Sequence, residues 1–397
     1  MPRAGRKLLV VAAVAVVIAA TAVPAQARAV PKGPTGDAFY APPDPLPHAE
    51  PGALIRAQPM AAPAGARAWR VLYHSRTVHG DDIAVSGIVV APIGAAPKGG
   101  RPIVSWAHGT TGLADACTPS KQDNASKVIP FLAELLGAGD VVVATDYEGL
   151  GPPGLHPYLV GESEGRGVLD VARAARHLHT DAGDALLVYG LSQGGHAALF
   201  AGELAHSYAP ELHLLGVAAG APPANLELIL PAAGMIKAAA SYLVMGAAGF
   251  HAAYPTADPE AILTPAAMAK LPLVDQLCAG DLAKQIASLN ASSVIARSPS
   301  SVPPWPSDLR RNSAGHRAAG APLFVFQGGA DTLVLPPLTD AFVHDACARH
   351  DIVDYKVYPG ASHGGVLFAA KQDILEWLAA RVKGDAARSI CGTPSAP

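Results

Sequence analysis

The chain has 397 residues, of which 50% are hydrophobic and only 15% are charged, and its formal net charge is -3. A chain this apolar folds into a globule rather than staying disordered. The near-neutral balance excludes a dedicated nucleic-acid binder, because no excess of Lys and Arg is available to neutralise phosphates. The 40 glycines and 37 prolines predict many loops and turns.

The N-terminus has the three-part plan of a secretory signal peptide. A basic start precedes an uninterrupted apolar run at 8–20, and a small-x-small cleavage pattern ends at Ala27, with Ala29 as a second position. The apolar run is shorter than the about 20 residues that span a bilayer. We therefore expect a secreted, extracellular protein from which residues 1–27 are removed near Ala27 or Ala29.

Cysteine usage agrees with export, because an even count in an exported chain is typical of disulfides. Four cysteines allow two bridges in three pairings, and buried free thiols are the alternative. None forms a CxxC pair and no histidine cluster has zinc spacing, so we expect no metal and no cofactor. The cysteines are Cys117, Cys278, Cys347 and Cys391.

The rest of the chain divides by pattern into an arm, a core and an insertion. Residues 28–65 are rich in Pro, Ala and Gly and predict an extended N-terminal arm. The core, 66–221 and 319–397, alternates short β-rich runs with helical segments. The insertion, 222–318, is rich in Ala and Leu but broken by Pro, which predicts several short helices.

The elements expected in the core define its fold class. Strands are expected at 69–74, 83–90, 102–106, 141–145, 185–190, 212–218, 322–327 and 353–358. Helices are expected at 126–138, 165–179, 196–207, 338–350 and 368–383. The alternation predicts an α/β protein whose mostly parallel central sheet of about eight strands is flanked by helices.

One motif carries chemistry, at the junction of the strand 185–190 and the following helix. The stretch Gly190-Leu191-Ser192-Gln193-Gly194 reads G-x-S-x-G, the pattern of a nucleophile elbow. The tight turn lifts the Ser192 hydroxyl above the sheet. It also directs the N–H of Gln193, at the positive end of a helix, toward the oxyanion that attack on a carbonyl creates.

The same pattern occurs a second time, at 161–165. There Ser163 stands between Glu162 and Glu164, whose charges oppose a developing oxyanion. Only a three-residue apolar run precedes it. We therefore expect Ser163 to cap a helix start rather than to attack a substrate.

A serine hydroxyl needs a base to become a nucleophile. In proteins with a nucleophile elbow, the catalytic residues follow along the chain in the order serine, acid, histidine. Asp331 follows the strand 322–327 and His363 follows the strand 353–358. Ligands bind at the carboxyl ends of parallel strands, so these loops can converge on Ser192. We expect Asp331 to orient His363, and His363 to take the proton of Ser192. The alternatives are that each residue only caps a turn or a helix.

The second oxyanion donor is expected from the loop after the third strand, His108-Gly109-Thr110-Thr111-Gly112. We predict that this donor is the N–H of Thr110, with Thr111 or Gly109 as alternatives. His108 is expected to be structural.

The residues resemble the secretory lipases of the α/β-hydrolase superfamily, the group of Candida antarctica lipase A. The similarity rests on GLSQGG at 190–195 and on the block 144–175, which is the more distinctive of the two. It implies an α/β-hydrolase fold, hydrolysis of triacylglycerols or other lipid esters, and a helical lid at 222–318. It further implies a bridge between Cys117 and Cys278, which leaves Cys347 and Cys391 for the second.

The leading interpretation is a secreted serine esterase or lipase that forms an acyl-enzyme on Ser192. The substrate is then a lipid or a small acyl ester, with transient contact to lipid interfaces and with neither nucleic acid nor a stable protein partner. A serine peptidase or an acyltransferase on the same fold, or a non-catalytic binding protein, is the alternative.

Apolar residues of the insertion could line an acyl-chain site, although ordinary helix core is an equally good interpretation of any one of them. They are Leu226, Leu228, Ile229, Leu230, Met235, Ile236, Leu243, Val244, Met245 and Phe250.

Overall fold

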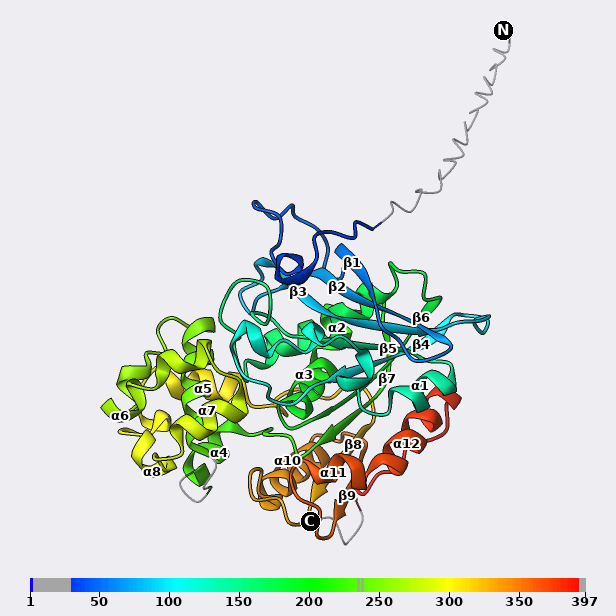
Figure 1. Ribbon diagram of the computed structural model, residues 1–397. Coiled ribbons are helices and arrows are strands. Elements are labelled where there is room, and N and C mark those ends of the chain that lie inside the picture. Colours follow the sequence, from blue (N-terminus) through cyan, green and yellow to red (C-terminus); the bar gives the residue numbers. More distant parts are fainter. Residues whose placement is uncertain (3–29, 234–235, 237–238, 393–397) are drawn as a thin grey trace.

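The protein is described by a computed structural model that covers residues 1–2, 30–233, 236 and 239–392 (Figure 1). The expected signal segment 1–27 and its cleavage positions at Ala27 and Ala29 lie outside these residues, apart from the first two. Within the described ranges, no helix has the length and apolar character needed to cross a membrane.

A single sheet of nine strands forms the centre of the molecule, in the order β1-β2-β3-β5-β4-β6-β7-β8-β9. The first three strands pair antiparallel, as does β3 with β5, and the others pair parallel. The strands are β1 Leu54–Met60, β2 Ala66–Arg76, β3 Asp82–Pro92, β4 Arg101–Ala107, β5 Val141–Thr145, β6 Ala182–Leu191, β7 His213–Gly220, β8 Leu323–Gly328 and β9 Val353–Tyr358.

The prediction of eight strands missed β1, which lies inside the segment 28–65 that was expected to be an extended arm. β1 contains Pro59, which cannot donate to a ladder and is tolerated at the edge of a sheet. It occupies such an edge and pairs only with β2. Residues 54–60 form a strand because they pair with β2, and the composition of the arm does not reveal this pairing.

The helices lie on both faces of the sheet and in the insertion. They are α1 Leu132–Ala138, α2 Gly161–Ala175, α3 Gln193–Tyr208, α4 Leu226–Ala232, α5 Ala239–Ala253, α6 Pro265–Met268, α7 Ala279–Ile286, α8 Ala291–Val294, α9 Trp305–Arg311, α10 Pro336–Ala348, α11 Gly365–Ala369 and α12 Lys371–Lys383. Short 3-10 helices occur at Gly36–Phe39, Asp115–Cys117, Pro119–Lys121, Ala125–Lys127, Pro259–Ala261, Leu271–Asp275 and Pro299–Ser301.

Two apolar cores sandwich the sheet. Helices α2, α3 and α10 pack on one face, and α1, α11 and α12 pack on the other. Alternate residues of a strand enter opposite cores, as Ile103 and Val104 of β4 do. This double cover explains why the parallel strands have nearly continuous apolar sequences.

The insertion forms the predicted cluster of short helices. Helices α4 to α8 gather at one side of the sheet, green to yellow at the left of Figure 1. They have an apolar core of their own, in which Phe250 stacks on Trp305 with ring centroids 5.8 Å apart. We call residues 222–318 the lid below.

Three helix predictions needed correction at their ends. The helix expected at 126–138 begins only at Leu132, because Pro130 precedes it and Phe131 has a left-handed φ of 60°. The helix expected at 165–179 begins at Gly161, so Ser163 lies inside α2 and caps nothing. The helix expected at 368–383 is two helices, α11 and α12.

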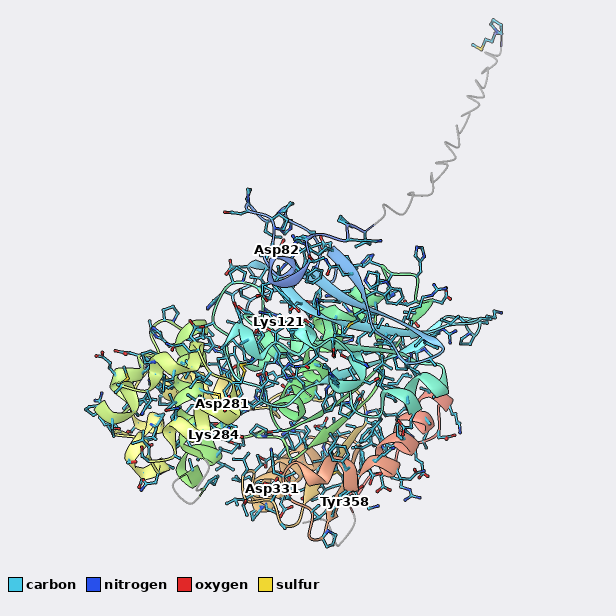
Figure 2. The ribbon with its side chains drawn as sticks, in the orientation of Figure 1. Asp82, Lys121, Asp281, Lys284, Asp331 and Tyr358 are labelled. Atoms are coloured by element: carbon cyan, nitrogen blue, oxygen red, sulfur yellow. A yellow bond between two sulfur atoms is a disulfide. The ribbon has the colours of Figure 1, made fainter. Side chains whose placement is uncertain are left out.

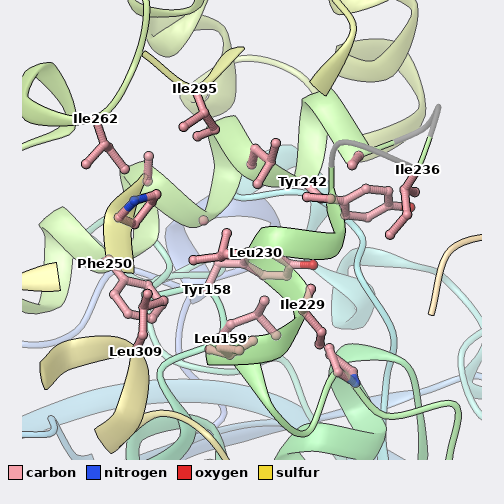
Figure 3. Close-up of a pocket in the computed structure, with 18 of the residues that line it drawn as sticks. Tyr158, Leu159, Ile229, Leu230, Ile236, Tyr242, Phe250, Ile262, Ile295 and Leu309 are labelled. Carbon is pink, nitrogen blue, oxygen red and sulfur yellow. The ribbon is translucent and has the colours of Figure 1, made fainter. Parts of the chain in front are cut away.

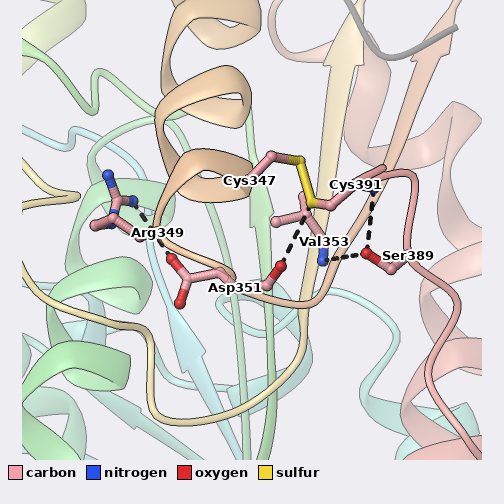
Figure 4. The surroundings of a disulfide bond; sticks show 6 residues. All are labelled: Cys347, Arg349, Asp351, Val353, Ser389 and Cys391. Atoms are coloured by element: carbon pink, nitrogen blue, oxygen red, sulfur yellow. Dashed lines mark hydrogen bonds and ion pairs between the residues drawn. A yellow bond between two sulfur atoms is a disulfide. The ribbon is translucent and has the colours of Figure 1, made fainter. Parts of the chain in front are cut away.

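Two disulfides join the four cysteines in the pairing that the resemblance implied. Cys117 bonds to Cys278, which ties the segment after β4 to the lid. Cys347 at the end of α10 bonds to Cys391, which fastens the C-terminal segment beside β9 (Figure 4). In the same place Ser389 Oγ accepts hydrogen bonds from the N–H groups of Val353 and Cys391.

Candidate active site

Ser192 stands at a sharp turn between β6 and α3. Its backbone has φ 59° and ψ -124°, a conformation that a residue other than glycine adopts only under strain. A methyl group on Gly190 would overlap the carbonyl of Gly194, and one on Gly194 would overlap the carbonyl of Ala107. The glycines on either side of Ser192 are therefore required by close backbone contact, as a nucleophile elbow demands.

The ends of the parallel strands bring the other predicted residues to the same rim. Gly190 of β6 is level with β7, whose last residue, Gly220, is level with Phe326 of β8. Asp331 comes three positions after the end of β8 and His363 five positions after the end of β9.

The two loops are also bonded to each other. Gly329 N donates to Tyr358 O at 2.9 Å, and Ala330 N donates to Ala361 O at 3.0 Å. Figure 2 labels Asp331 and Tyr358 in this part of the molecule.

Asp331 and His363 are in direct contact. His363 Nδ1 lies 2.7 Å from Asp331 Oδ2, and the carboxylate is completely buried. Its other oxygen, Oδ1, accepts from the N–H groups of Leu333 at 2.8 Å and Val334 at 3.0 Å. These bonds hold the carboxylate in place, so it can orient the imidazole.

The contact decides the tautomer of His363. An ionised carboxylate only accepts hydrogen bonds, so Nδ1 carries the proton and Nε2 has a free lone pair. Within the described part of the chain, Nε2 is buried and has no hydrogen-bond partner, so it makes no hydrogen bond to Ser192 here. Catalytic hydrogen bonds are often long before substrate binds. An unpartnered Nε2 is therefore compatible with a base that accepts the serine proton only when substrate is bound.

Gln193 follows Ser192 as the first residue of α3, so its N–H has no partner within the helix. Its side chain is buried and donates to Glu164 Oε1 at 2.8 Å and to His156 Nε2 at 2.7 Å. His156 Nδ1 in turn lies 2.8 Å from Glu148 O. Burial lowers the pKa of His156, in agreement with a neutral ring that accepts from Gln193.

Sequence reasoning missed this buried polar cluster behind the elbow. Glu164 Oε2 also pairs with His196 Nδ1 at 2.9 Å, and Ser163 Oγ donates to Glu148 Oε2 at 2.5 Å. The second G-x-S-x-G therefore supports the first one rather than competing with it. The physical reason is that a glutamate on the buried side of a helix, as Glu164 is, must find a buried partner.

The loop after β4, expected to supply the second oxyanion donor, packs on the elbow. A methyl group on Gly109 would lie 3.8 Å from Ser192 Cβ. Thr110 Oγ1 is 2.8 Å from Tyr158 OH. His108 is buried with Nδ1 2.8 Å from Gly109 O, and burial lowers its pKa to about 4, which fits the structural role expected of it.

An apolar cavity of about 120 Å³ is lined by Ser192 and by residues of the lid. Figure 3 shows side chains that line it, among them Leu230 and Phe250. Ser192 and Tyr158 contribute to its wall, and nine of the other twenty lining residues come from α4 and α5. Six of the ten apolar lid residues that the sequence singled out line it, namely Leu226, Ile229, Leu230, Ile236, Leu243 and Phe250.

The remaining four have other positions. Leu228 is 45% exposed, Val244 and Met245 belong to the core of the lid, and Met235 lies outside the described residues. No group of three or more His, Cys, Asp or Glu side chains in the described ranges is placed to hold a metal ion.

Comparison with known proteins gives a consistent result. Residues 124–296 match the model of the secretory lipase family. Lipase A of Moesziomyces aphidis is 25% identical over 99% of this chain and 89% of its own length. A Mycobacterium tuberculosis protein with the name "probable inactive lipase" is 28% identical, but the match spans only 51% of this chain and 48% of that protein.

Among solved structures, Candida antarctica lipase A superposes with a TM-score of 0.78 at 23% identity, over 90% of this chain and 88% of that one. At this identity the likeness establishes the fold, which is that of the α/β-hydrolases. The family match covers less than half of the chain, so together with the similar lipase sequences it shows that the chain resembles the secretory lipases.

Proposed function

We propose that the chain is an exported serine hydrolase that cleaves the acyl esters of lipids through an acyl-enzyme on Ser192. One observation carries the proposal. The imidazole of His363 is oriented by Asp331 with Nε2 unpartnered, at the rim where Ser192 opens into an apolar cavity. A serine, a positioned base and an acyl-chain site are the parts that ester hydrolysis requires.

In the first half of the proposed reaction, His363 Nε2 takes the proton of Ser192 while Oγ attacks the ester carbonyl. Asp331 stabilises the imidazolium that results. The carbonyl oxygen becomes an oxyanion and accepts hydrogen bonds from the N–H groups of Gln193 and Thr110, with the α3 dipole adding to the attraction. The C–O bond to the alcohol then breaks, and Nε2 returns its proton to the departing alkoxide.

In the second half, a water molecule donates its proton to His363 Nε2 and attacks the acyl carbon. A second oxyanion forms in the same hole and collapses. The Ser192 oxygen leaves with the proton held on Nε2, and the carboxylic acid is released. The enzyme returns to its starting state without a redox step or a metal.

The wall of the cavity supports a lipid substrate over a peptide. None of its described lining residues carries a charge, and most are aliphatic or aromatic. Each methylene of an acyl chain buried there contributes about 0.8 kcal/mol. A peptide carries amide groups that this wall offers few partners to satisfy, and burying them unpaired is unfavourable.

Export is supported by the signal-peptide pattern at 1–27 and by the two disulfides, which persist in oxidising compartments. N-terminal sequencing of the protein from a culture supernatant should begin near residue 28 or 30. Retention of the full-length chain inside the cells would contradict export.

The function is tested with purified protein and a series of p-nitrophenyl esters from acetate to palmitate, beside peptide p-nitroanilides. We expect ester turnover that Ser192→Ala abolishes, and no release from the anilides. Cleavage of the anilides alone would favour a peptidase. No turnover of any ester, dissolved or emulsified, would place the chain with its inactive relative. Added alcohol acceptors should reduce the yield of acid only partly, whereas an acyltransferase would give mainly the new ester.

A further inference from the structure

Two hydroxyl groups meet beside Ser192. Thr110 Oγ1 and Tyr158 OH are 2.8 Å apart. Tyr158 lines the same cavity as Ser192, and Thr110 follows Gly109, which is in contact with the elbow. The pair therefore lies close to where the carbonyl oxygen of a bound ester would lie in the proposed reaction.

In the described part of the structure, one of the two hydroxyl protons in this pair has no hydrogen-bond acceptor. Each hydroxyl carries one proton, and the bond between them uses only one of the two. Within the described residues, neither hydroxyl has a second hydrogen-bond partner. A buried O–H without an acceptor is costly, so the second proton is available for an acceptor that arrives with the substrate.

The chemistry of the two groups indicates which proton is free. A phenol is a stronger acid than an aliphatic alcohol and is therefore the better donor, so Tyr158 donates to Thr110 Oγ1. Thr110 keeps its own proton, and the bond it accepts polarises its O–H further. Burial raises the pKa of Tyr158 above its usual value, so the phenol stays protonated and able to donate.

Resting on the proposed function, we propose that the Thr110 hydroxyl is a third donor to the oxyanion, in addition to the N–H groups of Gln193 and Thr110, and that Tyr158 is the residue that positions it. Thr110 is then a catalytic residue through its side chain as well as its backbone.

The lid holds Tyr158 in place. A methyl group on Gly249 of α5 would overlap Tyr158 N and lie 2.8 Å from Tyr158 Cβ, so this helix packs directly on the tyrosine backbone. On the other side, Leu159 N donates to Glu164 Oε1 at 3.0 Å. The position of α5 therefore determines where the Tyr158 hydroxyl lies, and through it the orientation of Thr110.

The first test removes the hydroxyl of Thr110 and keeps its shape and backbone N–H. With p-nitrophenyl butyrate and the full-length mature protein, T110V should lower kcat by about 10²–10³ and leave KM nearly unchanged, whereas T110S should recover most of the loss. T111V is the matched control, because Thr111 Oγ1 is also buried but has no partner in the described structure. A T110V enzyme with the wild-type kcat, or a larger loss in T111V than in T110V, would overturn the proposal.

The second test asks whether Tyr158 acts through Thr110. Y158F should lower kcat by about tenfold, which corresponds to a weaker third donor. The double variant T110V/Y158F should be no slower than T110V alone, because the tyrosine has nothing left to position. Y355F is the control, because Tyr355 does not line the cavity and its hydroxyl bonds only to Asp340 in the described structure, so kcat should stay unchanged. If the losses in the double variant multiply, Tyr158 contacts the substrate itself and the assignment of the donor is wrong.

The outcomes separate this proposal from the proposed function. An inactive wild-type protein would remove both, whereas an active wild type with an unaffected T110V would remove only the third donor. Circular dichroism and the thermal midpoint identify variants that fail to fold. If T110V is one of them, T110A makes the same test with a smaller side chain and should show the same loss of kcat.

Discussion

Asp331 and His363 are separated by 32 positions in the chain and joined by a hydrogen bond of 2.7 Å. The same carboxylate accepts two backbone N–H groups and the side-chain amide of Gln327 at 3.2 Å. An acceptor held on every side cannot rotate, so its one remaining function is to fix the imidazole. This relationship leads to the first prediction.

Replacing Asp331 with Asn should lower kcat by about 10³–10⁴ without unfolding the protein. The amide oxygen can keep the backbone bonds, but its NH₂ then faces His363 Nδ1 and stabilises the tautomer whose Nε2 already carries a proton. The measurement is kcat with p-nitrophenyl butyrate. Asp340→Asn is the control, because that carboxylate bonds only to Tyr355 OH in the described structure. Equal effects of the two substitutions would remove Asp331 from the site.

The two G-x-S-x-G serines should respond very differently to the same change. Ser192→Ala should abolish turnover, since it removes the attacking oxygen. Ser163→Ala removes the donor to the buried Glu148 carboxylate and should cost about 1–3 kcal/mol in the free energy of unfolding, while kcat stays within an order of magnitude. Turnover and denaturant unfolding measured on both variants decide the point. Loss of activity in a folded Ser163→Ala protein would contradict this division of roles.

The two disulfides should differ in what their loss does. Both cross-link long segments, with separations of 161 and 44 residues, so removing either should lower the free energy of unfolding by up to about 4–5 kcal/mol. Only Cys117–Cys278 lies beside the loop after β4, which is proposed to supply an oxyanion donor and in which Thr111 O accepts from Ala279 N at 2.8 Å. The double Ser variant of this bridge should also lower kcat.

The matched control for that variant is Cys347→Ser with Cys391→Ser, which should lower only the thermal midpoint. Kinetics are measured well below both midpoints, so that unfolding does not contribute. An unchanged kcat after loss of Cys117–Cys278 would show that the loop holds its shape without the lid.

Filling the cavity should shorten the acyl chain that the enzyme accepts. Gly246 of α5 lines the cavity, and a methyl group built there has nothing within 4 Å. Gly246→Leu should therefore reduce kcat/KM for dodecanoate and longer esters while butyrate hydrolysis remains. Gly280 in α7 has equally open surroundings but does not line the cavity, so Gly280→Leu is the control. A uniform loss across all chain lengths in Gly246→Leu would argue against an acyl site here.

Asp140, the residue before β5, should make the protein less stable as pH rises. Burial raises the pKa of its carboxyl from 3.8 to about 7. Between these two values the unfolded chain releases the proton while the folded chain keeps it, which favours unfolding as pH increases. Asp140→Asn should remove this effect. The thermal midpoint of the variant, relative to that of the wild type, should therefore rise between pH 4 and pH 7 and stay constant above pH 7.

Thermal midpoints across that range measure the effect. Asp123→Asn is the comparison, because Asp123 is exposed and Lys127 lowers the pKa of its carboxyl, which gives the opposite sign. A constant difference between Asp140→Asn and wild type at every pH would contradict the assignment.

The positions of Ser192, Asp331 and His363 after strand ends could be predicted from the sequence because they depend on neighbours a few positions away. The turn at Ser192 needs its flanking glycines whatever surrounds it, and the loops that carry Asp331 and His363 follow runs with clear strand patterns. The alternation of strand and helix then allows few topologies, so the sheet and the edge at which these three residues lie followed. The lid was predicted as an insertion of short helices for the same reason.

Features that depend on a residue far away in the chain could not be predicted from local sequence patterns, and only the tertiary structure revealed them. β1 is a strand because β2 lies beside it, and Leu228 is exposed while Ile229 lines the cavity because of how α4 packs. The contacts of Glu164 with Gln193 and His196, and of Tyr158 with Thr110, join residues far apart in the chain. The type of a residue determines which hydrogen bonds its side chain can make. Which atom becomes the partner depends on how distant segments pack together, and the local sequence does not contain that information.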